Sequence, residues 1–230
     1  MRVSLAPAYV LHQRAYQETS KLVEVFSRDF GRVGLIAKGA RRSKSPWRGV
    51  LEPLQPLLLS WTGRGELPTL THAELSDVQG QLPGQQVYTA LYLNELLMRL
   101  VSRRDPHPQL FDVYGQTLSA LSDPTAPRLA LRLFERDLLA EIGYGLELER
   151  DCKDGAAIEA GEQYTYVLDQ GPMRSGDPNW GVRVSGRTLL ALGGSAEFDA
   201  QAERESKVLL RHLLQAHLGD KALETRRLFR

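Results

Sequence analysis

The first 80 residues carry the pattern that most limits the fold, namely short apolar runs separated by turns rich in glycine and proline. Five runs are predicted to be β-strands, at residues 8–14, 21–27, 32–38, 57–61 and 70–75. The second run has hydrophobic residues on both sides, which predicts a strand partly covered on both faces. Five strands in about 75 residues suit a small closed barrel, because closure leaves no exposed sheet edge.

The spacing of apolar residues becomes helical after this region. Helices are predicted at residues 86–102, 110–121, 128–142, 186–192 and 200–218. In the first of them, Asn94 and Arg99 are expected to face outward. Residues 146–185 lose the helical spacing, and the runs at 163–168 and 180–184 predict two strands of a small β insertion.

We therefore expect an α+β protein with two domains. The first, residues 1–80, is predicted to be a five-stranded oligonucleotide-binding (OB) barrel, the commonest soluble barrel of this size. The second, residues 81–230, is predicted to be α-helical, with the β insertion at about 146–185. A single cysteine excludes an internal disulfide and suits a reducing cytoplasm. No run approaches the roughly 18 apolar residues of a membrane span, and no signal peptide is expected.

Positive charge is concentrated between the third and fourth predicted strands. Six basic residues and no acidic ones lie between Gly31 and Leu51, so the rest of this +1 chain sums to −5. They are Arg32, Lys38, Arg41, Arg42, Lys44 and Arg48. Glycine, serine and proline predict a mobile loop at 38–48, here called the basic loop, with Trp47 as its exposed aromatic. These six cations and Trp47 are the predicted DNA-binding residues, although the loop alone is also compatible with a solvated turn.

A second cationic feature lies on the third predicted helix. Arg128, Arg132 and Arg136 recur every four residues and therefore lie near one face, with apolar residues beside them. This stripe suits a peptide with an acidic, hydrophobic end. The alternative is that the arginines pair with Glu135 or Asp137 of their own helix.

The C-terminal segment is a third cationic feature. It contains Lys221, Arg226, Arg227 and Arg230 in an amphipathic stretch. The alternative for this segment is an exposed, frayed tail.

Motifs of enzymes are absent from the sequence. It contains no phosphate-binding loop, no dinucleotide fingerprint and no nucleophile elbow. Cys152 has no cysteine partner for a zinc site of the usual kind. Glu147, Glu149, Asp151 and Asp154 supply at most part of a metal-dependent nuclease site, and a solvated acidic turn is the favoured interpretation. We expect no catalysis, no metal and no cofactor.

Five strings, in order along the chain, resemble the RecO family of bacterial recombination mediator proteins. They are Lys38-Gly-Ala-Arg-Arg-Ser-Lys44, Gly63-Arg-Gly-Glu66, Tyr92-Leu-Asn-Glu-Leu-Leu97, Arg132-Leu-Phe-Glu135 with Leu138-Leu139 and Gly143-Tyr-Gly145, and Arg226-Arg-Leu-Phe-Arg230. No single string is decisive, but their joint order is specific and covers nearly the whole chain.

The resemblance implies a cytoplasmic, nucleoid-associated protein of DNA repair and recombination. It implies binding of single- and double-stranded DNA, annealing of complementary strands, and work with RecR to load RecA onto DNA coated by single-strand-binding protein. It also implies that the helical domain binds the acidic tail of that protein, and Arg132 is the stripe residue inside a matching string. A protein–protein adaptor with little DNA contact is the alternative function.

Many members of that family carry a four-cysteine zinc module near residues 150–185. This chain has only Cys152 there. We therefore expect packing of Tyr164, Tyr166 and Trp180 to hold the insertion together.

Overall fold

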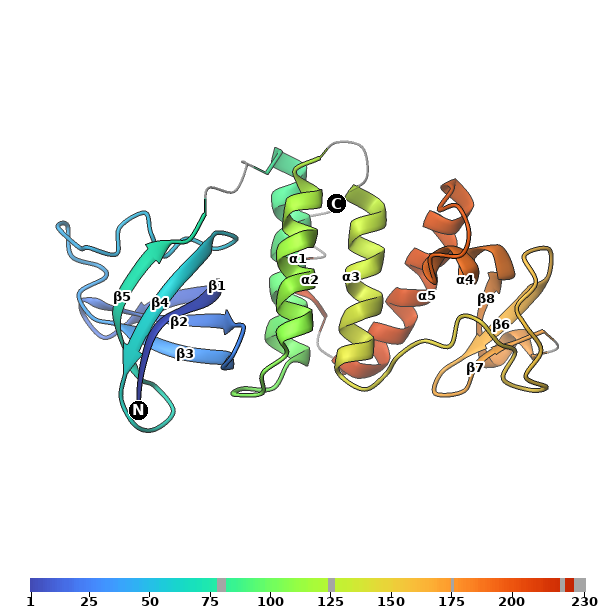
Figure 1. Cartoon of the computed structure of the whole chain (residues 1–230), viewed down its shortest axis with the longest axis horizontal. Helices are drawn as coiled ribbons and strands as arrows, with labels where there is room; N and C mark the ends of the chain where they lie inside the picture. The colour runs from blue at the N-terminus through green and yellow to red at the C-terminus, as the bar shows by residue number, and fades with distance from the viewer. Residues whose placement is uncertain (78–81, 124–126, 175, 220–221, 226–230) are drawn as a thin grey trace. The chain divides into compact units, whose positions relative to one another are not determined.

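The computed structural model describes residues 1–77, 82–123, 127–174, 176–219 and 222–225 (Figure 1). The chain forms two compact units, one of residues 1–123 with the segment from Ala222, the other of residues 124–221. The first unit therefore includes two helices together with the barrel, whereas the sequence placed all helices in the second domain. Among the described residues, no helix has both the length and the apolar character needed to cross a bilayer.

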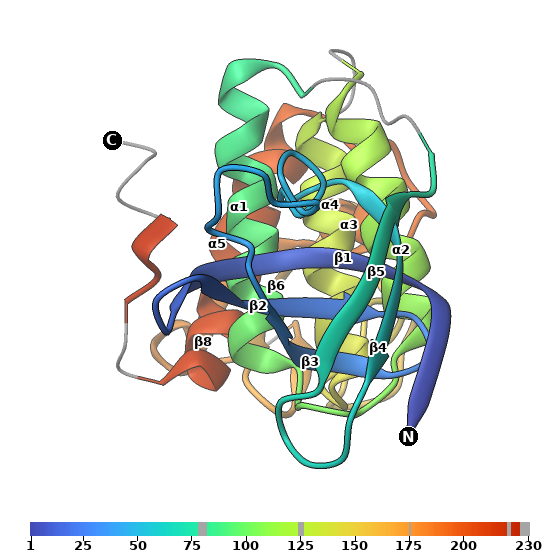
Figure 2. The ribbon, with the colours of Figure 1, turned by 90° about the vertical axis from the view of Figure 1, so that its left-hand side faces the viewer.

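A closed five-stranded barrel forms the N-terminal part of the first unit (Figure 2). Its strands are β1 (Arg2–Tyr16), β2 (Ser20–Ser27), β3 (Gly31–Ala37), β4 (Pro56–Thr62) and β5 (Thr69–Leu75). They follow the order β1-β2-β3-β5-β4, and β4 pairs back onto β1. All pairs are antiparallel except β3 with β5, which meet at Ile36 and Thr69. The predicted five strands and their OB-like arrangement are confirmed.

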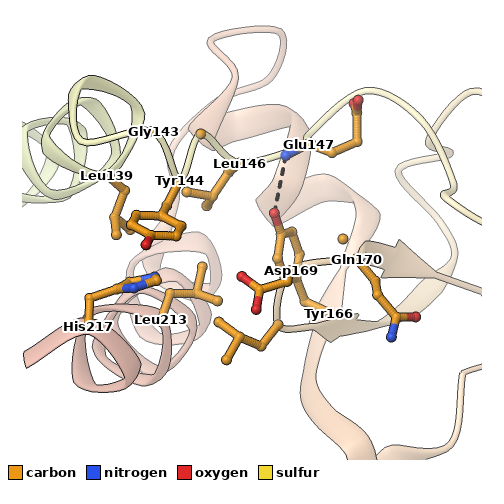
Figure 3. A pocket seen from close by; sticks show the side chains of 13 residues that line it. Leu139, Gly143, Tyr144, Leu146, Glu147, Tyr166, Asp169, Gln170, Leu213 and His217 are labelled. Carbon is orange, nitrogen blue, oxygen red and sulfur yellow. Dashed lines mark hydrogen bonds between the residues drawn. The ribbon is translucent and has the colours of Figure 1, made fainter. Parts of the chain in front are cut away.

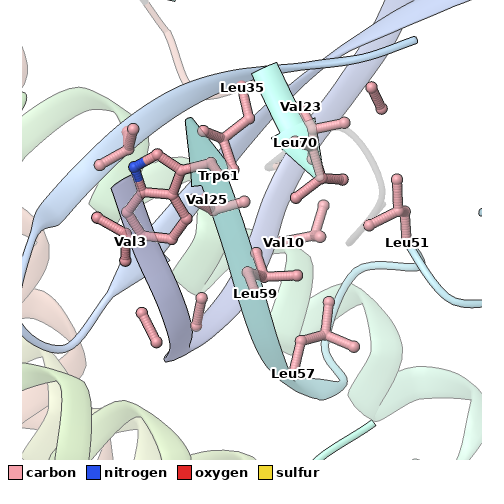
Figure 4. Close-up of a cluster of buried hydrophobic side chains, with 14 residues drawn as sticks. Val3, Val10, Val23, Val25, Leu35, Leu51, Leu57, Leu59, Trp61 and Leu70 are labelled. Atoms are coloured by element: carbon pink, nitrogen blue, oxygen red, sulfur yellow. The ribbon is translucent and has the colours of Figure 1, made fainter. Parts of the chain in front are cut away.

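The barrel interior is filled by alternate residues of all five strands (Figure 4). In the β2–β3 hairpin, Val25 lies opposite Val33 and Val23 opposite Leu35, and all four side chains are buried. Trp61 of β4 is the largest member of this core and is also buried. The alternation of strand side chains explains the pattern, since every second residue must face inward.

The outer face of the barrel is covered as well, over β1 and β2. Helices α1 (Gly84–Leu100) and α2 (Pro108–Leu121) belong to the same unit as the strands. The ring of Tyr9 lies 5.2 Å from Phe111 and 4.9 Å from Tyr114, and the ring of Phe26 lies 5.7 Å from Phe111. This aromatic layer explains why β2 is apolar on both sides, as its sequence predicted.

Asn94 on α1 is buried, so the prediction that it faces solvent is wrong. Its Nδ2 donates to the carbonyl of Leu11 at 3.0 Å, and its Oδ1 accepts from the hydroxyl of Tyr114. Leu11 lies at a bulge in β1, between the paired residues Val10 and His12, and takes no place in the ladder. A bulged residue leaves its backbone groups unpaired in the ladder. The side-chain amide of Asn94 provides a hydrogen-bond partner for the carbonyl of this bulged residue.

The second unit combines three helices and a small sheet. It contains α3 (Pro127–Glu141), β6 (Gln163–Val167), β7 (Gly171–Met173), the short 3-10 helix η1 (Pro178–Trp180), β8 (Gly181–Ser185), α4 (Gly186–Leu192) and α5 (Ala200–Leu218). The antiparallel sheet has the order β7-β6-β8. The sequence predicted β6 and β8, whereas the three-residue β7 is additional.

Backbone hydrogen bonds to two tyrosine hydroxyls hold the segment that precedes this sheet. The buried Tyr166 and Tyr164 accept at their hydroxyls from the backbone N–H of Glu147 at 3.1 Å and of Glu159 at 3.0 Å. The buried carboxylate of Asp151 accepts from the backbone N–H of Arg174 at 2.7 Å. Trp180 does not take part in this packing, since it is 73% exposed. The expectation is therefore right for the two tyrosines and wrong for Trp180.

Replacing Asn94 with Ala should lower the free energy of unfolding by about 1–3 kcal/mol. The reason is that the carbonyl of Leu11 and the hydroxyl of Tyr114 would be left buried without their partner. Denaturant titration measures the change. Gln85→Ala, at an exposed site on the same helix, should change it by no more than about 0.5 kcal/mol. Equal effects of the two substitutions would contradict the role given to Asn94.

Candidate nucleic-acid interface

The basic loop is a run of successive turns that follows β3. Backbone N–H groups of Arg42, Ser45 and Arg48 donate to the carbonyls three residues earlier, at 3.1, 3.1 and 3.3 Å. Gly39, which accepts the first of these bonds, has a φ of +69°, a value that favours glycine. The loop thus has a defined backbone path between the third and fourth strands.

Trp47 is half-buried, so the prediction of an exposed aromatic is wrong. Its ring packs against the barrel core, as does Val50, and Leu51 is itself part of that core. The indole Nε1 donates to the carbonyl of Lys38 at 3.0 Å. The physical reason is that the loop shields the apolar core at this end of the barrel from water. The geometry favours anchoring of the loop over stacking on a base.

Five cations of the basic loop remain exposed around this anchor. They are Lys38, Arg41, Arg42, Lys44 and Arg48. Among the described residues, no carboxylate forms an ion pair with any of them. Positive charges that no ion pair neutralises raise the local potential and attract polyanions. The structure therefore brings five of the six predicted cations together on one surface.

Arg41 joins the basic loop to the turn between β1 and β2. Its guanidinium donates to the carbonyls of Gln17 at 3.2 Å and Glu18 at 3.1 Å, and its backbone N–H donates to Thr19 at 2.9 Å. The loop and this turn consequently form a single surface at one end of the barrel.

Arg32 lies elsewhere. It is half-buried on the outer side of β3, where its guanidinium donates to the carbonyl of Met98 on α1. Burial lowers the pKa of this guanidinium, and the nearby carboxylate of Glu24 acts in the opposite direction. The alternation of β3 explains the separation, because Arg32 points to the face that α1 covers.

Two cations that the sequence analysis did not select lie near the β1–β2 turn, at the end of β1 and the start of β2. Lys21 on β2 pairs with Ala37, the residue before Lys38, and Arg14 on β1 is exposed opposite Leu22. The sequence alone does not reveal these positions, because they follow from the register of β1, β2 and β3, which is known only once the strand pairing is known.

The arginines of α3 are all paired. Arg132 is buried and forms an ion pair with Glu135 at 2.6 Å, and Arg136 pairs with Asp137 at 2.6 Å. Arg128 pairs with Glu203 of α5 at 2.9 Å, although its side chain is 76% exposed. The first two pairs correspond to the alternative interpretation of this stripe, and Arg128 is the member that solvent reaches most freely.

The acidic residues after α3 act as hydrogen-bond acceptors within their own turns. Glu147 accepts from the backbone N–H of Glu149 and of Arg150, and Asp154 accepts from that of Ala156. In the part of the chain that the structure describes, no group of three or more His, Cys, Asp or Glu residues is placed to hold a metal ion. Cys152 is a free, exposed thiol. The C-terminal cations Lys221, Arg226, Arg227 and Arg230 lie outside the described residues.

Comparison with known proteins agrees with this architecture. The family model described as Recombination protein O N terminal matches residues 1–79, and the one described as Recombination protein O C terminal matches residues 84–227. The chain belongs to the RecO family. The resemblance drawn from the five sequence strings is thereby confirmed.

Similar RecO proteins span the whole chain. A DNA repair protein RecO of Nitrosococcus oceani is 51% identical over 98% of this chain and 92% of its own length. Proteins with the same name from Alkalilimnicola ehrlichii and Methylococcus capsulatus are each 45% identical over 100% of this chain, and over 92% and 94% of their own lengths. The match to the N-terminal family model ends at residue 79, and the match to the C-terminal model begins at residue 84, the first residue of α1. The basic loop therefore lies wholly within the N-terminal match.

Replacing Trp47 with Phe should lower the free energy of unfolding by about 1 kcal/mol, because the hydrogen bond to the Lys38 carbonyl is lost. Chemical denaturation measures this change. The same substitution at the exposed Trp180 serves as the matched control and should leave stability within about 0.5 kcal/mol of the parent. If Trp47→Phe leaves stability unchanged, Trp47 does not anchor the loop.

Proposed function

We propose that this protein is a DNA-binding mediator of DNA repair and recombination and that it acts without catalysis. The observation that carries the proposal is the set of five exposed cations at one end of an OB-like barrel. Its RecO relatives, which are named DNA repair proteins, support the same biological role. DNA contacts of this kind are made to phosphates, so they extend to single and double strands alike.

The route of DNA across the barrel follows from which surfaces are open. The outer faces of β1 and β2 are covered by aromatic residues of α2, and Arg32 of β3 is bonded to α1. We therefore assign DNA binding to the barrel end formed by the basic loop and the β1–β2 turn. Two complementary strands held there with their charge screened would anneal more readily, because phosphate repulsion opposes their approach.

Partner binding is assigned to the helical part of the chain. In this proposal the acidic, hydrophobic C-terminal tail of single-strand-binding protein contacts the surface around Arg128, Arg132 and Arg136. Arg128 is the accessible residue, and a tail carboxylate would compete with Glu203 for it. The buried Arg132–Glu135 pair supports the helix from within. Together with RecR, the protein would then help to load RecA onto the exposed strand.

The DNA-binding proposal predicts a strong dependence on salt. Five phosphate contacts give a log–log slope of about −3.5 on single strands, since each contact contributes about −0.7. Changing Arg41, Arg42 and Lys44 to Ala should reduce that slope by about 2 and weaken binding to all sequences alike. Fluorescence anisotropy with labelled oligonucleotides measures both quantities.

A charge-matched control separates the loop from the overall charge of the protein. Arg183, Lys207 and Arg211 are exposed residues of the second unit, and replacing them with Ala removes the same charge. This triple variant should keep the parental slope. Equal losses in the two triple variants would remove the basic loop from the proposal.

The tail-binding proposal is tested separately. A peptide with the tail sequence should bind the full chain, and Arg128→Ala should weaken it roughly tenfold, as expected when a charged hydrogen bond is lost. Arg183→Ala, an exposed arginine of β8, is the control and should bind like the parent. Calorimetric titration gives both affinities. Parental affinity in Arg128→Ala would locate the tail elsewhere.

A second candidate function is a protein–protein adaptor with little DNA contact, and the covered strands of the barrel favour it. Parental DNA affinity in the loop triple variant, combined with lost tail binding in Arg128→Ala, would support the adaptor. A metal-dependent nuclease is a weaker candidate, because the carboxylates at 147–154 already accept backbone hydrogen bonds. Labelled DNA that is cleaved with magnesium or manganese would support it.

A further inference from the structure

A pocket of about 200 Å³ lies within the second unit, between the ends of α3 and α5 and the β6–β7 turn (Figure 3). Its apolar wall includes Leu139, Leu146 and Leu213. On one side, Tyr144 stacks on His217 with ring centroids 3.7 Å apart. This volume suits one or two side chains of a binding partner.

The electrostatic character of the pocket is negative. It lies near the C-terminal ends of α3 and α5, where it is lined by Leu139 of α3, by Gly143 just after that helix, and by Leu213 and His217 of α5. A helix C-terminus carries a partial negative charge, and here two such ends face the same space. Two carboxylates, Glu147 and Asp169, line the pocket, and no lysine or arginine does so among the described residues.

Asp169 is the carboxylate that is free to bind a ligand. Glu147 is occupied, because its Oε1 accepts from the backbone N–H of Glu149 at 2.8 Å and of Arg150 at 3.0 Å. Asp169 directs its carboxylate towards Leu213 (Figure 3), and no described residue forms a hydrogen bond or ion pair with it. Its φ of +60° is in the left-handed region, which aspartate tolerates better than most residues.

The residues that line the pocket favour arginine over other cations. Leucines accommodate the methylene stem of a long side chain. Tyr144, a residue that is 48% exposed, can offer a planar cation the ring face that does not stack on His217. Arginine matches both features, and its guanidinium binds a carboxylate through two parallel hydrogen bonds.

We infer that this pocket docks an arginine side chain of a partner protein, next to an apolar residue of that partner. Asp169 binds the guanidinium, and the leucine wall holds the neighbouring side chain. The charge of this site is opposite to that of the α3 arginines, so an acidic tail and a basic segment would occupy separate places on the protein.

The inference is tested with short peptides and the full-length chain. The probes are acetyl-Leu-Arg-Leu-amide and the same peptide with citrulline, which keeps the shape of arginine but carries no charge. The arginine peptide should bind, and either citrulline in the peptide or Asp169→Asn in the protein should weaken binding about tenfold or more. Asparagine is chosen because it also tolerates a positive φ, so the turn is retained.

Glu197→Gln, at an exposed position outside the pocket, is the matched control and should bind the arginine peptide like the parent. Thermal melting confirms that both variants are folded. Equal affinity for the arginine and citrulline peptides, or parental affinity in Asp169→Asn, would overturn the inference. Free arginine amide that binds as tightly as the peptide would indicate a small-molecule site instead. Self-association that Asp169→Asn abolishes would identify the occupant as a second copy of this chain.

These outcomes are independent of the DNA-binding proposal. The peptide titrations use no DNA, and the pocket and the basic loop belong to different compact units. A failure of peptide binding therefore leaves the salt dependence of the loop untouched.

Discussion

One buried amide links the strands of the first unit to its helices. Asn94 bonds both the bulged carbonyl of Leu11 and the hydroxyl of Tyr114, and so joins β1, α1 and α2 at one point. Because an unpaired polar group is costly in an apolar setting, the bulge and the asparagine depend on each other. The aromatic layer of Tyr9, Phe26 and Phe111 packs between the same strands and α2.

This covering of β1 and β2 limits where the proposed DNA contact can lie. The strand surface is occupied by helices of the same unit, so the open positive charge lies at the end of the barrel. There, the basic loop carries five exposed cations that form no ion pair with a described carboxylate, and Arg41 joins the loop to the β1–β2 turn. The fold thus supports a site made of loops on a rigid base, a common arrangement for binding surfaces.

Local patterns in the sequence were sufficient to predict the strands other than β7, the α-helices and the concentration of charge. Alternation located β2 and β3, and apolar spacing located α5, because these signals depend on neighbouring residues alone. Besides Trp180, three residues were misplaced, and each of these three contacts a part of the fold that its local sequence does not reveal. Asn94 donates a hydrogen bond to the carbonyl at the bulge in β1, and Arg32 donates one to a carbonyl of α1. Trp47 packs against the core formed by the barrel strands. The Arg128–Glu203 pair and the negative pocket likewise required the packing of α3 against α5.

Under the proposed function, the anchored position of Trp47 has a consequence for how the basic loop would distinguish paired from unpaired bases. It is the only aromatic residue between Lys38 and Leu51, and its ring is engaged with the barrel. Contacts made through charge alone do not require a base to leave its stack. Binding of DNA by this loop would therefore persist while a single strand becomes a duplex. Release of the DNA would require competing charge or another protein.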